Sequence, residues 1–396
     1  MTSSDKSVTA EAASGTTSVF DLGKILDLSV SHFIHDVYSS FLAPLLPLLI
    51  EKLSLSLTQA GFLTTVMQIP ALMNPYIGQL ADRISVRYFV ILAPALTAIP
   101  MSMIGVAPSY GVLLLLLFVA GISVAIFHVP APVMVARLAG GHKGRGMSFF
   151  MTGGELARAV GPLTAVGAVS LMGLEGFYPI MLVGIVASGW LYWRFRKVNL
   201  DISDRRRKLS VRATWKGMHR VLGPLSAILV ARGFMHAVMT AFLPIFIIME
   251  SGNLWLAGAA LTIFEIAGVA GVLAAGSLSD HLGRRRMLLI SLLGAPLSLL
   301  LFVYSGGWVR VAALLLTGFT LLSTTPVMLA LVQEHADGSS PAAANGMFMM
   351  ISFLARSAVV VVVGMIADGI GLHTTYVIAA AAGMTGIPFV LMLPRR

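Results

Sequence analysis

The chain contains apolar stretches of about 20 residues that recur along most of its 396 positions. A helix of that length crosses a hydrocarbon core ~30 Å thick. Because that core holds no water to satisfy backbone groups, only helices or a closed barrel can span it. Uninterrupted apolar runs such as 111–118 and 359–365 favour helices, since barrel strands alternate in polarity. The composition agrees, because 57% hydrophobic and 11% charged residues lie far from the soluble globular class.

These stretches predict an all-α integral membrane protein with twelve spanning helices. The charged segment 194–220 separates six spans from six. The expected parts are a disordered N-terminal tail (1–23), a six-helix bundle (24–197), a basic cytoplasmic linker (198–218) and a second six-helix bundle (219–396). The expected spans are 26–50, 58–81, 88–107, 110–137, 145–171, 176–195, 219–248, 255–279, 287–306, 309–333, 341–367 and 373–393.

Lysine and arginine are concentrated on one side of this predicted topology. If both termini are cytoplasmic, 22 of the 27 Lys and Arg residues fall in cytoplasmic segments, and only Lys52 and Arg310 fall in outer ones. The positive-inside rule therefore predicts cytoplasmic termini. The same placement accounts for the net charge of +10 and argues against a nucleic-acid partner. The basic run 205–208 is expected to be a solvated loop, with contact to anionic membrane lipids as the alternative.

A short basic motif occurs twice, each time at the end of an apolar stretch. The first copy runs from Gly78 to Arg87 and the second from Gly276 to Arg286. The aspartates of the two copies lie 198 positions apart, which is half the chain. Fainter similarities recur at nearly the same offset, between segments 41–44 and 242–244 and between segments 157–158 and 355–356. This spacing predicts two related halves.

Twelve spans, a central charged loop and the pattern Gly-x-x-x-Asp-Arg/His-x-Gly-Arg-Arg resemble the major facilitator superfamily. The second copy of the motif fits fully, whereas Ser85 and Val86 depart from the pattern in the first. The resemblance implies two pseudo-symmetric six-helix bundles that move against each other. It also implies a conformational latch at the cytoplasmic side, with Asp82 facing helix 11 and Asp280 facing helix 5. The latch residues expected from the motif are Gly78, Asp82, Arg83, Arg87, Gly276, Asp280, Gly283 and Arg284.

A narrower resemblance rests on four further segments of the first half. These segments look like the fosmidomycin-resistance group of bacterial efflux transporters, from which Glu155 and Arg158 are departures. Gly161 and Pro162 resemble the kinked helix 5 of proton-driven exporters, and a proline there removes a backbone donor. The segments are Ser31-His32-x-x-His35-Asp36, Phe127-His128-x-Pro130, Val135-Ala136-Arg137 and Gly153-Gly154…Gly161-Pro162-Leu163.

Three arginines stand inside predicted spans, where ionisable groups are costly and usually functional. Arg158 and Arg356 occupy equivalent positions of the two halves and are expected to face each other across a central cavity. Together with Arg232 they can clamp a carboxylate or phosphonate. The alternative is that each arginine neutralises a nearby acid, and Glu155, one helical turn from Arg158, is an obvious partner. The remaining candidates for substrate contact are His32, His128 and His236.

The predicted proton carrier is Asp36, because a carboxylate in a partly dry cavity can load and unload a proton near neutral pH. Glu155 and Glu265 compete for this role, and His35 is a candidate relay. Residues His32, His35 and Asp36 share one helical face. Two histidines and one acid on a single helix leave a metal site incomplete, so the sequence predicts no metal.

The chain contains no Gly-x-x-x-x-Gly-Lys-Ser/Thr phosphate loop and no cysteine. We therefore expect no cofactor and no direct use of ATP. The expected protein is a monomeric, multi-pass antiporter of the inner membrane. We expect it to use protons to export a small anionic molecule, as in drug resistance. Proton-coupled uptake of a metabolite anion is the alternative. A membrane enzyme needs a nucleophile–base pair or a metal set that the histidines do not clearly assemble. A membrane sensor would usually carry a sizeable soluble domain.

Overall fold

The computed structural model describes residues 20–74, 77, 86–140, 143–198, 211–335 and 341–394. All regular elements in these ranges are helical. Those of the first half are α1 (Leu22–Ser39), α2 (Leu42–Leu53), α3 (Leu57–Gln68), a 3₁₀ turn (Ile69–Met73), α5 (Val86–Met103), a 3₁₀ turn (Ile104–Val106), α6 (Tyr110–His128), α7 (Ala131–Leu138), α8 (Lys143–Met172), a 3₁₀ turn (Tyr178–Ile180) and α9 (Met181–Phe195).

The second half repeats this arrangement. Its elements are α10 (Val211–Ala237), a π-helical turn (Val238–Phe242), α11 (Leu243–Ser251), α12 (Leu254–Leu282), α13 (Arg284–Tyr304), α14 (Gly307–Glu334), α15 (Pro341–Ile370), α16 (Leu372–Met384) and α17 (Ile387–Met392). Within the described residues, nine helical segments are long and apolar enough to cross a membrane. Three of the expected spans, 58–81, 145–171 and 176–195, are not among them, so the count of twelve stays a prediction.

Two helices depart from the expected uninterrupted spans at equivalent places in the two halves. The span expected at 26–50 divides between Ser39 and Leu42, and the span expected at 219–248 contains the π-helical turn. Each break directly precedes a helix with proline in its first turns, Pro44 in α2 and Pro244 in α11. Because proline lacks a backbone donor, the preceding helix cannot continue its regular hydrogen bonds through it.

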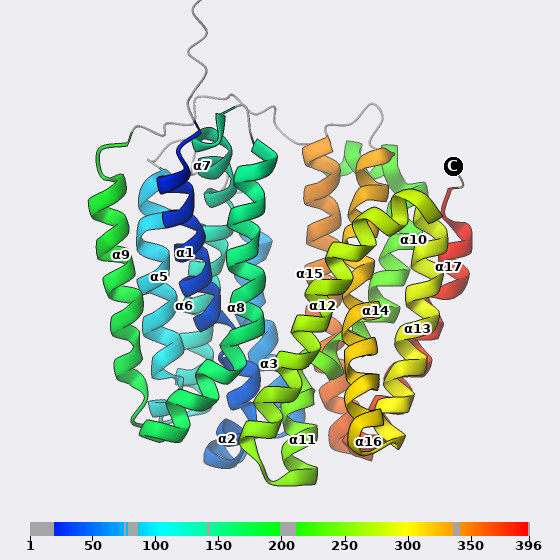
Figure 1. Cartoon of the computed structure of the whole chain (residues 1–396). Coiled ribbons are helices and arrows are strands. Elements are labelled where there is room, and N and C mark those ends of the chain that lie inside the picture. The colour runs from blue at the N-terminus through cyan, green and yellow to red at the C-terminus, as the bar shows by residue number, and fades with distance from the viewer. Residues whose placement is uncertain are drawn as a thin grey trace, which may run out of the picture.

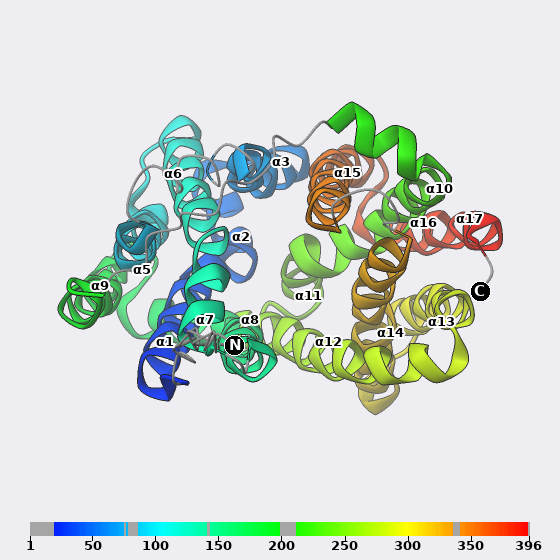
Figure 2. The ribbon, with the colours of Figure 1, turned by 90° about the horizontal axis from the view of Figure 1, so that it is seen from above.

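The helices form two bundles that meet at one end and lie apart at the other (Figure 1). We call the end where α1 begins and α17 ends the terminal side, and the opposite end the far side. Seen along the helices, α8 lies beside α12 and α3 lies beside α15 (Figure 2). These two helix pairs form the seam between the bundles.

The buried apolar side chains follow the same division. On the terminal side each bundle has its own core, one around Leu28, Phe127 and Phe150, the other around Leu225 and Phe348. On the far side a single core runs through both bundles and includes α1, α3, α11 and α15. Because helices in a membrane are held together largely by van der Waals packing, this shared core joins the bundles at the far side.

Small residues at the seam allow the helix backbones to approach closely. A Cβ added at Gly364 of α15 would lie 2.6 Å from the carbonyl oxygen of Leu57 and 2.8 Å from the Cα of Thr58. A Cβ added at Gly61 of α3 would lie 2.7 Å from the carbonyl oxygen of Val360. The hydroxyl of Thr65 donates to the Ser357 carbonyl across the same seam at 2.9 Å. Such contacts are typical of close-packed membrane helices.

Gly364→Ala is therefore expected to destabilise the seam, because overpacking of a close contact costs about 1–3 kcal/mol. Gly369→Ala on the same helix is the matched control, since a Cβ there meets nothing within 4 Å. Alanine also favours a helix by roughly 0.5–1 kcal/mol over glycine. The thermal unfolding midpoint in detergent should fall for the first variant and stay level or rise for the second. Equal midpoints would contradict the close approach.

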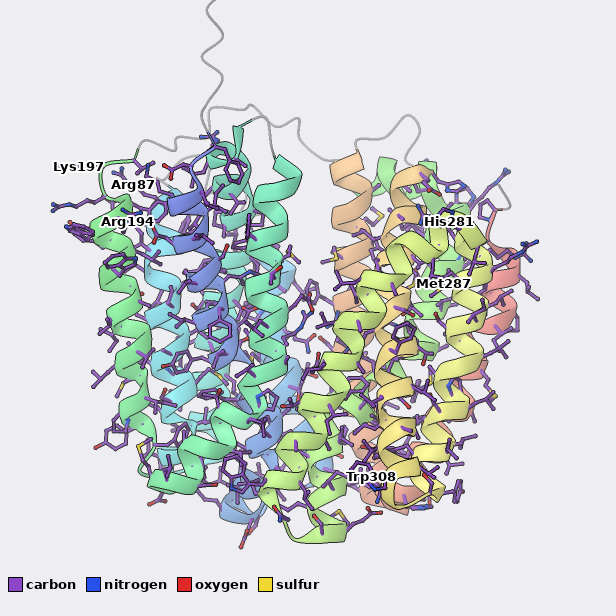
Figure 3. All side chains as sticks on the ribbon, in the orientation of Figure 1. Arg87, Arg194, Lys197, His281, Met287 and Trp308 are labelled. Carbon is purple, nitrogen blue, oxygen red and sulfur yellow. The ribbon has the colours of Figure 1, made fainter. Side chains whose placement is uncertain are left out.

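Charged and aromatic side chains mark the two ends of the molecule. Arg87, Arg194, Lys197 and His281 lie at the terminal side, and the 87% exposed Trp308 lies at the far side (Figure 3). Arg194 pairs with Asp27 at 2.7 Å. Tryptophan at one end of a spanning helix is typical of a membrane–water interface.

Candidate functional site

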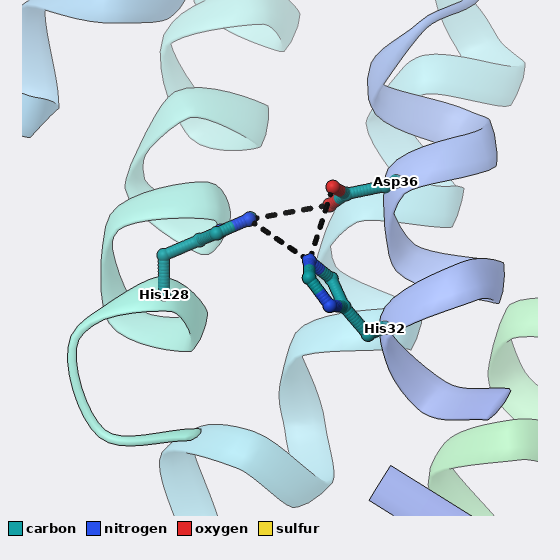
Figure 4. Close-up of side chains that lie close together, drawn as sticks. All are labelled: His32, Asp36 and His128. Carbon is teal, nitrogen blue, oxygen red and sulfur yellow. Dashed lines mark hydrogen bonds and ion pairs between the residues drawn. The ribbon is translucent and has the colours of Figure 1, made fainter. Parts of the chain in front are cut away.

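Four ionisable side chains gather inside the first bundle. His32, His35 and Asp36 lie on α1, and His128 ends α6. Figure 4 shows His32, Asp36 and His128. The Asp36 carboxylate is 3.2 Å from Nε2 of His32, 2.8 Å from Nδ1 of His35 and 3.5 Å from Nε2 of His128. His32 Nε2 and His128 Nε2 are 3.3 Å apart. The helical spacing places the first three on one side of α1, as expected, and packing of α6 adds the fourth.

Aromatic rings and a glycine hold this histidine cluster, which comprises His32, His35, Asp36 and His128. The ring of His32 stacks on Phe150 at 4.1 Å between centroids, and the ring of His35 stacks on Phe127 at 4.5 Å. A Cβ added at Gly154 would lie 2.5 Å from the His32 ring. A glycine at position 154 therefore leaves room for the imidazole between α1 and α8. The proton-carrier role of Asp36 stays a prediction.

A second group of charges lies at the seam between the bundles. Arg158 of α8 forms an ion pair with Glu155, one turn away, as the i, i+3 spacing indicates. Its Nε also lies 4.0 Å from the carboxylate of Glu265 on α12, in the other bundle. The guanidinium of Arg158 therefore interacts with two carboxylates, and its contact with Glu265 is the longer of the two. The side chain of Glu265 is 14% exposed.

The other two arginines belong to the second bundle. Arg232 of α10 is 7% exposed, and it donates to the Thr325 hydroxyl and the Leu321 carbonyl, each at 3.3 Å. Its Nε has no hydrogen-bond partner. Arg356 of α15 lies over the ring of Phe353 at 5.5 Å. In the part of the chain that the structure describes, no carboxylate lies within ion-pair distance of either arginine.

These charges act on one another across the seam. Arg158 and Arg356 are close enough for electrostatic repulsion between their positive charges, and so are Arg356 and Arg232. His236, whose Nδ1 is 3.3 Å from the Thr240 hydroxyl, lies within the field of all three arginines. Asp36 in turn acts on Arg158. The histidine cluster and the arginines therefore form one polar layer that extends through both bundles, with a cationic excess in the second.

The predicted latch lies largely outside the described residues. Gly78, Asp82 and Arg83 are not described, and for Gly276 and Asp280 only the backbone of α12 is. Gly283 adopts φ +89 between α12 and α13, a conformation that favours glycine. Two basic residues of the predicted latch have described side chains, and each contacts its own bundle. Arg284 pairs with Glu334 at 3.1 Å, and Arg87 donates to the Val198 carbonyl at 3.0 Å. The latch across the bundles stays a prediction.

The two helix 5 residues lie inside the unbroken helix α8. A Cβ added at Gly161 would collide with the Ser40 hydroxyl and lie 3.2 Å from the carbonyl oxygen of Val37. The backbone oxygen of Pro162 would lie 3.6 Å from a Cβ at Gly258 of α12. Gly161 and Pro162 therefore lie where α8 comes close to α1 and to the other bundle. The kink expected at these residues stays a prediction.

One contact between the bundles, made by Asp368, was not predicted from the sequence. The carboxylate of Asp368, near the end of α15, accepts hydrogen bonds from the backbone N–H groups of Leu57 and Thr58 at 2.7 and 2.8 Å. It also accepts from the Thr58 hydroxyl. The N-terminus of α3 is thus capped by a carboxylate of the other bundle, where unpaired N–H groups and the helix dipole favour negative charge.

Two helical bundles with a polar layer that extends through both are the architecture of a membrane transporter. The sequence model of the Major Facilitator Superfamily matches residues 28–258 and 225–396. The chain belongs to this superfamily, as its resemblance predicted, and it is a multi-pass membrane protein.

Two bacterial relatives match nearly the whole chain. The chain is 27% identical to the fosmidomycin resistance protein of Escherichia coli (strain K12), over 98% of this chain and 97% of the relative. It is 25% identical to an uncharacterised MFS-type transporter, YfnC, of Bacillus subtilis (strain 168), over 92% and 91%. The narrower resemblance to the fosmidomycin-resistance group is thereby confirmed.

Solved structures of transporters share the fold. A mutant of the nucleoside transporter NupG superposes with a TM-score of 0.78 at 16% identity, covering 93% of this chain and 100% of that one. A bacterial homologue of the lysosomal transporter Spinster, in an inward-facing and unoccupied conformation, gives 0.76 at 14% identity, covering 93% and 94%.

Proposed function

We propose that this protein is a secondary active transporter that exchanges protons for a small organic anion across the inner membrane by alternating access. The observation that carries the proposal is Arg232, a buried cation that has only neutral hydrogen-bond acceptors among the described residues. An uncompensated buried charge is costly, and in membrane proteins such groups mark substrate or ion pathways. An anionic substrate would supply the missing counter-charge.

The arrangement of the arginines supports a carboxylate- or phosphonate-bearing substrate. Guanidinium groups bind both kinds of oxyanion through two parallel hydrogen bonds. Arg232 and Arg356 lie in the second bundle and Arg158 in the first, so an anion between them contacts both halves. A cavity of about 300 Å³ opens between α3 and α15; its lining is mostly apolar and includes Gln68, Phe353 and Ser357, and Arg356 lies over the ring of Phe353.

The closed far side and the separate cores at the terminal side support an inward-facing state. The charge asymmetry supports a cytoplasmic position for both termini. With that orientation, the shared core and the Asp368 cap close the outer end, and the bundles lie apart at the inner end (Figure 1). The structural likeness to an inward-facing transporter supports this assignment.

Asp368→Ala is expected to weaken closure of the outer end, because loss of a helix cap costs about 0.5–2 kcal/mol. That corresponds to roughly a 2- to 30-fold change in the ratio of closed to open states. The chain has no cysteine, so spin labels attached through Glu51→Cys and Trp308→Cys would report the outer distance without further changes. Asp368→Asn keeps one acceptor oxygen and should shift the distance less. Identical distance distributions for all three proteins would contradict a role for the cap.

Of the three acids predicted as proton carriers, the contacts favour Glu265 over Asp36 and Glu155 as the group that couples transport to protons. Glu265 shares Arg158 with Glu155, and it faces the opposite bundle across the seam. Protonation would remove its attraction to Arg158 and so favour separation of α8 from α12 at the seam. A difference in protonation between the two states is what couples a proton gradient to the conformational change.

Export is the favoured direction. The relative from Escherichia coli is named for resistance to an antibiotic, and efflux is the simplest route from a transporter to resistance. Uptake of a metabolite anion is the second candidate, because the cationic excess of the second bundle suits an anion moving in either direction.

A ligand screen tests the anion assignment. Purified protein in detergent should gain thermal stability with organic phosphonates and carboxylates, because a ligand that binds only the folded state stabilises it by about 2.7 kcal/mol at 100 times its dissociation constant. Matched cationic amines should give no shift. Stabilisation by the amines alone would contradict the proposal.

A further inference from the structure

We infer that His32, Asp36 and His128 form a binding site for a divalent transition-metal ion of the zinc type. Three potential ligand atoms from two helices converge in this cluster (Figure 4). The sequence offered only two histidines and an acid on one helix, and packing of α6 against α1 supplies the further imidazole from a different helix.

The distances between the ligand atoms suit a tetrahedral ion. Zinc–nitrogen and zinc–oxygen bonds of about 2.0–2.2 Å at tetrahedral angles imply ligand atoms about 3.3–3.6 Å apart. The two Nε2 atoms are 3.3 Å apart, and their nearest Asp36 oxygens lie at 3.2 Å from His32 and 3.5 Å from His128. The two histidines approach different carboxylate oxygens, so Asp36 can bind an ion through either oxygen or through both.

Hydrogen bonds to the far nitrogens orient both imidazoles for metal binding. Nδ1 of His32 lies 2.8 Å from the carbonyl oxygen of Phe150, and Nδ1 of His128 lies 3.0 Å from that of Val124. A carbonyl can only accept, so each Nδ1 carries the proton and donates it. In the neutral ring Nε2 then presents its lone pair to the cluster. Metal-binding histidines nearly always make this kind of outer hydrogen bond.

The carboxylate has an outer partner as well. Nδ1 of His35 lies 2.8 Å from Oδ1 of Asp36 and donates to it, which fixes the carboxylate without using the Nε2 atoms of the other two histidines. Two lone pairs and a carboxylate that face one another repel unless a cation lies between them. Either a metal ion or a proton can fill that place, and the surrounding hydrogen bonds match those of a metal site.

The site has the form of an exchangeable rather than a purely structural metal centre. Three protein ligands leave a fourth position open, as in zinc sites that bind water or substrate. The His128 side chain is 38% exposed, whereas His32 is 4% exposed, so that position is reached from the His128 side. The ion would lie in the same polar layer as Arg158, whose charge acts on His128.

Zinc titration by calorimetry tests the inference, with full-length protein in detergent at neutral pH and without a polyhistidine tag. We expect one Zn²⁺ per chain, and loss of a ligand in His128→Ala or Asp36→Asn should weaken binding by about 100-fold or more, since removing even outer partners costs 10–100-fold. His219→Ala, which removes an exposed histidine of α10, should bind as the wild type does. Thermal midpoints without metal would show that the variants fold.

Two results would overturn the metal site. One is the absence of saturable Zn²⁺ binding to the wild-type protein, which would leave a proton as the cation of the cluster. The other is binding that survives in both ligand variants. X-ray absorption of the zinc-loaded wild type provides a reading that needs no variant: two imidazoles and carboxylate oxygen are expected. Neither readout involves transport, so the metal site and the proposed transport activity can fail independently.

Discussion

Replacing Arg232 with methionine is expected to weaken binding of the anionic substrate strongly while leaving the protein at least as stable. The guanidinium is buried and has no carboxylate partner among the described residues, so its removal relieves an uncompensated charge. Hydrogen bonds to a charged group contribute about 1.5–3 kcal/mol, which predicts binding weaker by roughly 10- to 150-fold. Anion-dependent thermal shifts measure both quantities in one experiment.

Arg310→Met in the same bundle is the matched control. Arg310 pairs with Glu250 at 2.6 Å and lies over the ring of Phe302 at 4.8 Å. Its loss leaves Glu250 without this partner and removes packing, so the thermal midpoint should fall while anion binding persists. If Arg232→Met instead destabilises the protein and retains anion binding, the arginine has a structural role and the substrate assignment is wrong.

Glu265→Gln is expected to uncouple anion transport from the proton gradient. Glutamine keeps the size of the side chain but cannot exchange a proton, and its weaker attraction to Arg158 resembles that of the protonated acid. Liposomes containing the variant should still exchange labelled anion for unlabelled anion. They should no longer accumulate or expel it in response to an imposed pH difference.

Glu250→Gln is the control for this second substitution, because Glu250 pairs with Arg310 away from the polar layer. It should transport with the pH dependence of the wild type. A Glu265→Gln protein whose flux still follows the pH gradient would exclude Glu265 as the coupling acid.

The class of fold follows from the sequence because hydrophobicity and helix length are local properties. Apolar stretches of membrane-spanning length predicted helices, and i, i+3 spacing predicted the pair of Glu155 with Arg158. The prolines Pro44 and Pro244 were also visible in the sequence and indicate the breaks that precede them, although the expected spans ran through these breaks.

The contacts that define the site depend on packing between segments far apart in the chain. His128 joins His32 across 96 positions, and Asp368 caps the N-terminus of α3 across more than 300. No pattern in one stretch of sequence reports such a pairing. The glycine at position 154 was a visible signal, but its meaning, room for the His32 ring, needed the position of α1 against α8.

Anion flux in liposomes under an imposed pH difference tests the central claim most directly. Purified protein would be reconstituted, loaded with labelled fosmidomycin or a related phosphonate, and given a pH difference in either direction. A proton–anion exchanger should move the anion against its own gradient toward the more acidic side, and a protonophore should abolish this movement. Flux that ignores both the pH difference and the protonophore would contradict the account.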